Sequence, residues 1–164
     1  MAKTIYEKIW DKEVPSYELY RRYDADEDDG IMAILDIHPA TRGHVLVIPK
    51  RPARTWLQLG LIAHQQASSL TYMVAKRQED VLGVETVTPA NFGEQVPHVH
   101  YHSMPSYEPG DTIHRMHPDS GRMQEPIDHD DLSLLREQLA FPPELAAEAD
   151  AQLAHLSRFA IHLF

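Results

Sequence analysis

The sequence predicts an α+β domain in which an antiparallel sheet packs against one long helix and a second helix near the C-terminus. Three observations support this class. Short apolar runs stand at residues 30–38 and 43–50, apolar residues recur at helical spacing over residues 56–82, and residues 142–160 have the composition of a helix. The chain has 164 residues and no internal repeat, which suits one domain.

The predicted strands lie in the first two thirds of the chain. The runs 30–38 and 43–50 are joined by the loop PATR, and Pro49 ends the second strand because proline has no N–H for a central ladder. The long helix of residues 56–82 should stop at Gly83. Residues 84–91 (VETVTPAN) and 94–105 (EQVPHVHYHSMP) then supply the third and fourth strands.

The stretch between the fourth strand and the last helix has a different character. Residues 104–131 contain four prolines and two glycines, so we expect a surface excursion there. The last helix begins near Pro142 and Pro143, because the first turn of a helix tolerates proline.

Composition excludes several classes of protein. The formal net charge of −10 argues against a general electrostatic grip on nucleic acid or an anionic membrane. The absence of cysteine excludes disulfides, thiolate zinc sites and cysteine nucleophiles. No apolar run reaches the length of a membrane span, and the first residues are too charged for a secretory signal. We therefore expect a soluble, cytoplasmic protein.

Three histidines, His98, His100 and His102, occupy every second position of EQVPHVHYHSMP. In a strand they would share one face, roughly 6.5 to 7 Å apart. Besides a merely solvated strand face, two chemistries fit this row. A zinc site would use two imidazoles with a third ligand such as His44 or an acidic residue. A phosphate site would use the central imidazole as nucleophile, with partly protonated neighbours that balance charge and donate to phosphoryl oxygens.

Three blocks of the sequence together resemble the histidine triad (HIT) family, whose motif is His-φ-His-φ-His-φ-φ with φ apolar. The blocks are TIYEKIWDKEVPSYELY, ILDIHPATRGHVLVIPKRP and NFGEQVPHVHYHSMP, and they run in order from about Thr4 to Pro105. The resemblance implies a HIT core over residues 1–105, with residues 106–164 as a C-terminal extension packed on the same domain. It also implies a meander sheet with helices, and a homodimer in which two subunits extend the sheet.

The same resemblance implies a function. HIT proteins are nucleotide hydrolases or transferases that act at an α-phosphate without a catalytic metal or other cofactor. We expect a purine nucleotide substrate, either a dinucleoside polyphosphate or a nucleoside phosphoramidate. The alanine-rich, acidic C-terminal helix is similar to that of the dinucleoside polyphosphate branch. The alternatives are a nucleotide-binding regulatory module with little turnover and a zinc enzyme that uses His98 and His100.

Catalytic roles carry over to four histidines. His100, in the middle of the motif, would be the nucleophile that forms a covalent nucleotidyl-imidazole intermediate. His98 and His102 would orient and polarise the phosphate, and His102 could protonate the leaving group. His44 would support the triad from the neighbouring strand, although without the resemblance it could equally be a core histidine.

Substrate-binding roles carry over to four further residues. Asp36 would bind the ribose hydroxyls, since a carboxylate can accept from two vicinal hydroxyls; its alternative role is to form a turn at the strand end. Asn91 and Gly93 would place amide and backbone donors on the phosphate, although Gly93 could also be an ordinary turn glycine. Gln95 is a candidate phosphate donor as well. Three apolar residues would line the base pocket: Ile5, Ile9 and Ile34.

The chain departs from the family pattern at three places. Glu94 follows Gly93 where many members have glutamine, so either Gln95 takes over the phosphate contact or Glu94 turns away. Thr4 and Glu7 stand where some members carry two cysteines, which predicts that no structural zinc is bound. Ser103 replaces an apolar residue after the triad.

Overall fold

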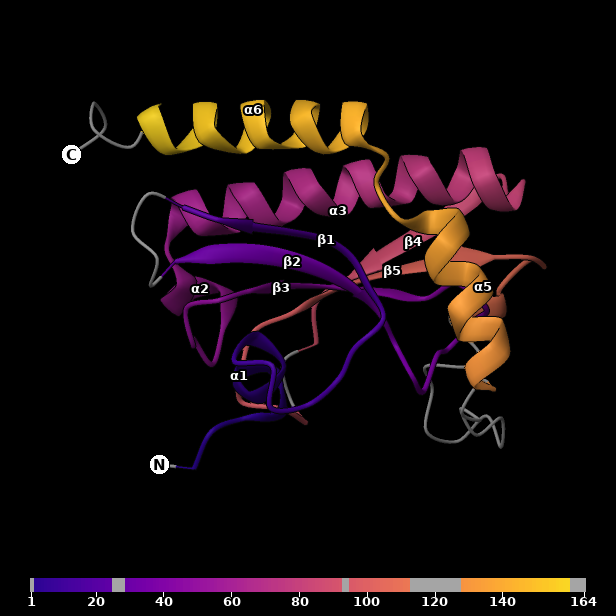
Figure 1. Ribbon diagram of the computed structural model, residues 1–164, viewed down its shortest axis with the longest axis horizontal. Helices are drawn as coiled ribbons and strands as arrows, with labels where there is room; N and C mark the ends of the chain where they lie inside the picture. Colours follow the sequence, from indigo (N-terminus) through magenta and orange to yellow (C-terminus); the bar gives the residue numbers. More distant parts are fainter. Residues whose placement is uncertain (1, 25–28, 93–94, 113–127, 160–164) are drawn as a thin grey trace.

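The computed structural model describes residues 2–24, 29–92, 95–112 and 128–159 (Figure 1). Its helices and strands are, in chain order, α1 (Ile5–Trp10), β1 (Glu18–Tyr23), β2 (Gly30–Leu35), β3 (Val45–Pro49), α2 (Trp56–Leu59), α3 (Leu61–Leu82), β4 (Thr86–Ala90), β5 (Tyr101–Ser106), α5 (His129–Leu139) and α6 (Pro143–Phe159). The predicted α+β class is confirmed.

The five strands form one antiparallel sheet in the order β1-β2-β3-β5-β4. This order differs from a simple meander at one place, because α3 carries the chain to the far edge of the sheet and β5 returns between β3 and β4. The return pairs Leu46 with His102 and Val45 with Ser103. The strand that follows His44 therefore lies beside the strand that carries His102.

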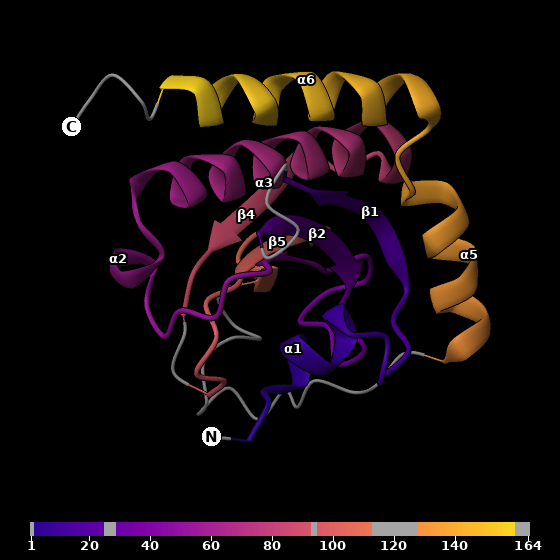
Figure 2. The same ribbon diagram turned by 60° about the vertical axis from the view of Figure 1, so that its left-hand side comes forward.

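The sheet separates two apolar clusters, because successive strand residues point to opposite faces. Ala33 and Val47 face the larger cluster, to which α3, α5 and α6 contribute Leu70, Leu135 and Leu153. On the other face, a smaller cluster joins β2 and β3 to α1. Figure 2 shows α3 and α6 running side by side over one face of the sheet, with α1 on the opposite side. The site lies on the α1 face.

Three elements were absent from the sequence expectations. The edge strand β1 contains two arginines and alternates weakly. The helix α1 begins at a capping box formed by Thr4 and Glu7. The helix α5 begins at the end of the stretch expected to be an excursion, where the Asp128 side chain accepts from two backbone N–H groups. Residues 113–127 of that stretch lie outside the described ranges.

Glycines delimit the long helix. Gly83 ends α3 in the left-handed conformation, as predicted. Gly60, with φ of +87°, breaks the single helix expected over residues 56–82 into α2 and α3. Leucine at the same position would be strained at this φ, so the break depends on glycine.

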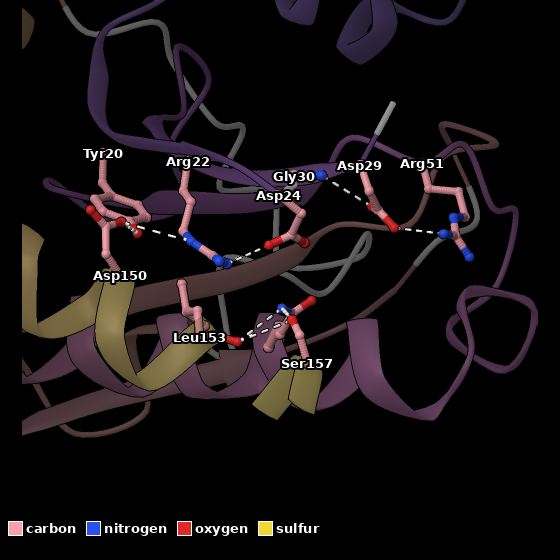
Figure 3. Close-up of polar contacts among 10 residues, drawn as sticks. Tyr20, Arg22, Asp24, Asp29, Gly30, Arg51, Asp150, Leu153 and Ser157 are labelled. Atoms are coloured by element: carbon pink, nitrogen blue, oxygen red, sulfur yellow. Dashed lines mark hydrogen bonds and ion pairs between the residues drawn. The ribbon is translucent and has the colours of Figure 1, made fainter. Parts of the chain in front are cut away.

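A cleft of about 650 Å³ lies between the start of α3, the end of α6 and the β1–β2 end of the sheet. Both arginines on its wall are paired: Arg22 with Asp24, and Arg51 with Asp29, each at 2.6 Å (Figure 3). Tyr20 donates to Asp150 at 2.5 Å and so fastens α6 to β1.

None of the helices in the described ranges is long and apolar enough to cross a bilayer.

Candidate active site

The three triad histidines come together at the start of β5, but only His102 belongs to the strand. The expectation of a strand over residues 94–105 was wrong for residues 95–100, which precede β5. Pro97 has no N–H, and the Val99 N–H bonds to Ala53 O instead of a strand neighbour. His98 and His100 therefore lie in an irregular segment that leads into the strand.

The ring contacts are nevertheless close. The centroids of His100 and His102 are 4.8 Å apart, nearer than the spacing expected along an extended strand. The ring of Tyr6, from α1, lies 5.7 Å from that of His98 and 4.8 Å from that of His100. The site is thus built from α1, the segment before β5, and β5 itself.

A chain of hydrogen bonds fixes the tautomers of His44 and His102. The Ala40 N–H donates to Nδ1 of His44 at 3.1 Å, so the proton of the neutral ring is on Nε2. That Nε2–H donates to Nδ1 of His102 at 2.9 Å. The proton of His102 is therefore on its Nε2, which is buried and has no hydrogen-bond partner among the described residues. Within the described ranges, this N–H is a donor without an acceptor.

His100 has the opposite tautomer. Its Nδ1 lies 2.9 Å from the carbonyl oxygen of His98, which can only accept, so Nδ1 carries the proton. The lone pair is then on Nε2, for which the described residues provide no hydrogen-bond donor. A free lone pair on His100 stands next to a free N–H on His102, and this is the arrangement of a nucleophile beside an electrophilic donor.

Both nitrogens of His98 are occupied. Nε2–H donates to Pro49 O at 2.8 Å, and Nδ1 accepts from the Thr4 hydroxyl at 3.2 Å. The Thr4 oxygen in turn accepts the Glu7 N–H, so the N-cap of α1 is bonded to the triad. His98 is thereby fixed in place and offers no free nitrogen to a metal.

Burial lowers the pKa of all four histidines below the usual value near 6.5. The pKa of His44 falls to about 3, and so does that of His102, where His44 and His100 add to the effect of burial. All four rings are neutral at pH 7. The expectation that the flanking histidines are partly protonated is wrong for the free protein, because burial lowers the pKa of both rings.

Asp36 lies beside the hydrogen-bond chain. Its Oδ1 accepts the His38 N–H at 2.9 Å, which is the turn-forming role considered from the sequence, and its Oδ2 lies 3.5 Å from Nδ1 of His44. Asp36, His44 and His102 each offer a ligand atom within 4.8 Å of the others, which is a possible cation-binding group. Both nitrogens of His44 are already hydrogen-bonded and its side chain is 1% exposed. These ligand atoms therefore fit the chain of hydrogen bonds from Ala40 to His102 better than they fit a metal site.

A family model described as HIT domain matches residues 25–109, just over half of the chain. The chain belongs to the HIT family. An uncharacterized HIT-like protein of Borreliella burgdorferi is 30% identical over 115 residues, which are 66% of this chain and 78% of that protein.

Two solved structures share the HIT fold. A Hit-like protein from Bartonella henselae has a TM-score of 0.66 at 23% identity and matches over 84% of this chain and 94% of its own. A hypothetical histidine triad nucleotide-binding protein from Sulfolobus tokodaii has a TM-score of 0.67 at 21% identity over 94% of each chain.

The loop that leads to the HIT motif is only partly described. Asn91, expected to donate to phosphate, instead donates its amide to the carbonyl oxygen of His100 at 2.8 Å. Gln95 is exposed. Gly93 and Glu94 lie outside the described residues. Asn91 therefore holds the backbone of His100 in the free protein.

Two aromatic residues of the HIT site were not expected from the sequence. Phe92 packs edge-on against His102 at 5.3 Å and is half exposed. Tyr6 is buried against the triad, and burial together with the charge of Asp36 raises its pKa. The i, i+3, i+4 spacing of Tyr6, Ile9 and Trp10 could have identified the buried face of α1. Of the residues expected to form a base pocket, Ile9 and Ile34 are core residues and Ile5 is 44% exposed.

Proposed function

We propose that this HIT protein is a nucleotide hydrolase that acts at an α-phosphate through a covalent intermediate on His100. The observation that carries the proposal is the pairing of a free lone pair on His100 Nε2 with a free Nε2–H on His102, both set by hydrogen bonds to other groups. The Sulfolobus tokodaii protein of the same fold is named as a nucleotide-binding protein, which is consistent with a nucleotide as the ligand here.

The reaction proceeds in two displacements. The His100 lone pair forms the N–P bond while the bond from phosphorus to the leaving group breaks and the leaving group takes its electron pair. The positive charge that develops on the ring is stabilised by the bond from Nδ1–H to His98 O. Water then attacks phosphorus, the N–P bond returns its electrons to Nε2, and the proton of water goes to solvent. The split replaces one difficult displacement by two easier ones.

His102 stabilises the transition state as a neutral donor. Its Nδ1 accepts the N–H of His44. A second proton on His102 would sit on Nδ1 and point at that N–H, so His102 stays neutral. A leaving group that departs as a phosphate anion needs no proton, whereas an amine does. We therefore rank a dinucleoside polyphosphate above a nucleoside phosphoramidate as substrate.

Asp36 would bind the ribose. Its Oδ2 accepts no side-chain hydrogen bond in the described residues, because Nδ1 of His44, at 3.5 Å, carries no proton, and it is available to the sugar hydroxyls.

The test is to trap the intermediate. The protein is mixed with a radiolabelled diadenosine polyphosphate in the presence of a chelator, quenched, and examined for acid-labile nucleotide on protein. Wild type should carry label and His100→Ala should carry none. His64→Gln is the matched control, because His64 bonds to Tyr101 and lies outside the triad. A His100→Ala variant as active as wild type would exclude His100 as the nucleophile.

A second candidate, a nucleotide-binding module with little turnover, is favoured by the loop before the triad. One of the two N–H groups of the Asn91 amide is already bonded to His100 O, which leaves one fewer expected donor for a phosphate. Calorimetric binding of AMP without hydrolysis of any substrate in a panel of dinucleoside polyphosphates and phosphoramidates would support this role over catalysis.

We also propose a homodimer that pairs through the β4 side. The edge strand β4 and the adjacent face of α3 border a groove of about 740 Å³, and Tyr72 on that groove is 72% exposed. Light scattering should give a dimer for wild type and a monomer for Tyr72→Glu. Leu134→Glu, an exposed apolar position on α5, should remain dimeric. We also propose a cytoplasmic location, with which the absence of cysteine is compatible.

A further inference from the structure

A glutamine on α3 lies directly behind the catalytic histidines. Gln78 is fully buried, on the side of the sheet opposite the site. Its Nε2 donates to Gly43 O at 2.8 Å and to Ser103 O at 3.1 Å. Its Oε1 accepts from the Ser103 hydroxyl at 2.6 Å. All hydrogen-bonding groups of this amide except one lone pair are used, which is how a buried amide avoids a desolvation penalty.

The two carbonyls that Gln78 binds belong to residues next to His44 and His102. Gly43 comes directly before His44, and Ser103 comes directly after His102. Because strand residues alternate, Ser103 faces α3 while His102 faces the site. Gln78 thus joins, from behind the sheet, the same two backbone segments whose imidazoles meet in front of it at 2.9 Å.

The backbone at Gly43 is also restricted by its conformation and by the packing of α3. Its φ is +82°, and a Cβ there would come within 2.7 Å of the Leu82 side chain, so α3 packs tightly against this turn. The His44 backbone itself is held by two further bonds, from its N–H to Thr41 O and from the Asp36 N–H to its carbonyl. Gln78 adds a bond that ties this turn to β5 through a side chain.

We propose that Gln78 is a positioning residue for the His44–His102 pair, and that the hydroxyl of Ser103 completes the hydrogen bonds of its amide. The two carbonyls can only accept, so they place Nε2 on their side of the amide, and the hydroxyl of Ser103 donates to the remaining Oε1. Ser103 stands where the HIT motif has an apolar residue, so this pair of polar residues is a feature of this chain. The consequence for catalysis rests on the proposed function; the consequence for the imidazoles does not.

The matched control for Gln78 is on the same helix. Gln66 is also buried, and its Nε2 donates to Leu153 O and Ser157 Oγ, at 3.1 and 2.8 Å. Those acceptors lie on α6 (Figure 3), so Gln66 ties two helices together away from the triad. Replacing either glutamine by methionine keeps the volume and removes the same kind of amide.

The experiment compares Gln78→Met with Gln66→Met in two measurements. Nitrogen-15 NMR of the imidazoles in the ligand-free protein should show His102 as a single Nε2–H tautomer in wild type and in Gln66→Met. In Gln78→Met it should show a mixture. With diadenosine polyphosphate, kcat should fall about tenfold to a hundredfold in Gln78→Met with KM changed less than about twofold. Gln66→Met should lower Tm and leave kcat within about twofold.

A single His102 tautomer and an unchanged kcat in Gln78→Met would overturn the proposal. Ser103→Ala covers the case in which Gln78→Met does not fold: it should shift the His102 signals partway, and unshifted signals would also overturn it. If wild type hydrolyses no nucleotide, the proposed function fails while the NMR comparison still decides the role of Gln78.

Discussion

The Nε2–H of His44 donates to Nδ1 of His102 over 2.9 Å, and the Ala40 N–H holds the other nitrogen of His44 at 3.1 Å. A backbone amide therefore determines, through two imidazoles, which nitrogen of His102 carries its proton. Both rings are buried, so water does not compete for these bonds.

Removing the first ring of this chain should impair catalysis more than folding. His44→Phe keeps the ring volume but leaves Nδ1 of His102 without a donor, so His102 can place its proton on either nitrogen. We expect kcat for a dinucleoside polyphosphate to fall about tenfold to a hundredfold. His38→Phe, an exposed position in the same loop, should keep full activity. Equal activity of the two variants would contradict the role given to His44.

The depressed pKa values also predict how stability depends on pH. The pKa of His44 and of His102 is 6.5 in the unfolded chain and about 3 in the fold. Between pH 6.5 and pH 3 the unfolded chain therefore binds more protons than the folded protein, and a fall in pH favours unfolding. The contribution of each neutral ring to the free energy of unfolding is complete above pH 6.5 and is lost as the pH falls toward 3. Each such ring contributes a slope of about 1.4 kcal/mol per pH unit.

Urea unfolding at several pH values between about 7 and 4 measures that slope. His44→Phe should lose stability less steeply than wild type as the pH falls, because one buried imidazole is gone. The carboxylates are common to both proteins and cancel in the comparison. Identical slopes would show that His44 does not stay neutral in the fold.

The sequence predicted which histidines lie together better than it predicted the backbone that carries them. Alternation placed three histidines on one strand, but Pro97 and the bond from Val99 to Ala53 keep His98 and His100 out of the sheet. The element types of β2, β3, β4 and α3 were predictable because their apolar periodicity is local. The strand β1 was not, because an edge strand with two arginines lacks that signal.

Contacts between distant residues were the other limit. Gln78 and Ser103 are ordinary polar residues in their own segments, and their meeting depends on how α3 lies on the sheet. The protonation of the triad likewise follows from burial, which alternation of residue types does not report. Partial protonation was expected from the pKa of free imidazole, and desolvation reverses it.

The N-cap of α1 should influence the site through His98. Thr4→Ala removes both the cap of α1 and the hydroxyl that donates to Nδ1 of His98. We expect a loss of about 1 kcal/mol in the free energy of unfolding and a lower kcat. Thr55→Ala removes the cap of α2, which accepts the Gln58 N–H away from the triad, and should affect stability alone. A Thr4→Ala variant with wild-type kcat would show that His98 needs no such support.

The carboxylate of Asp36 should discriminate ribose from deoxyribose. Asp36→Asn keeps an oxygen for the His38 N–H, so the turn should survive, but it replaces the second acceptor by an NH₂ group. For a ribonucleotide substrate we expect kcat/KM to fall about tenfold, the loss of roughly one hydrogen bond to a charged group. For the 2′,3′-dideoxy analogue the variant and wild type should differ by less than about twofold, because neither can bind absent hydroxyls. Measuring both substrates on both proteins gives a double cycle, and an equal loss on the two substrates would mean that Asp36 acts on His44 and not on the sugar.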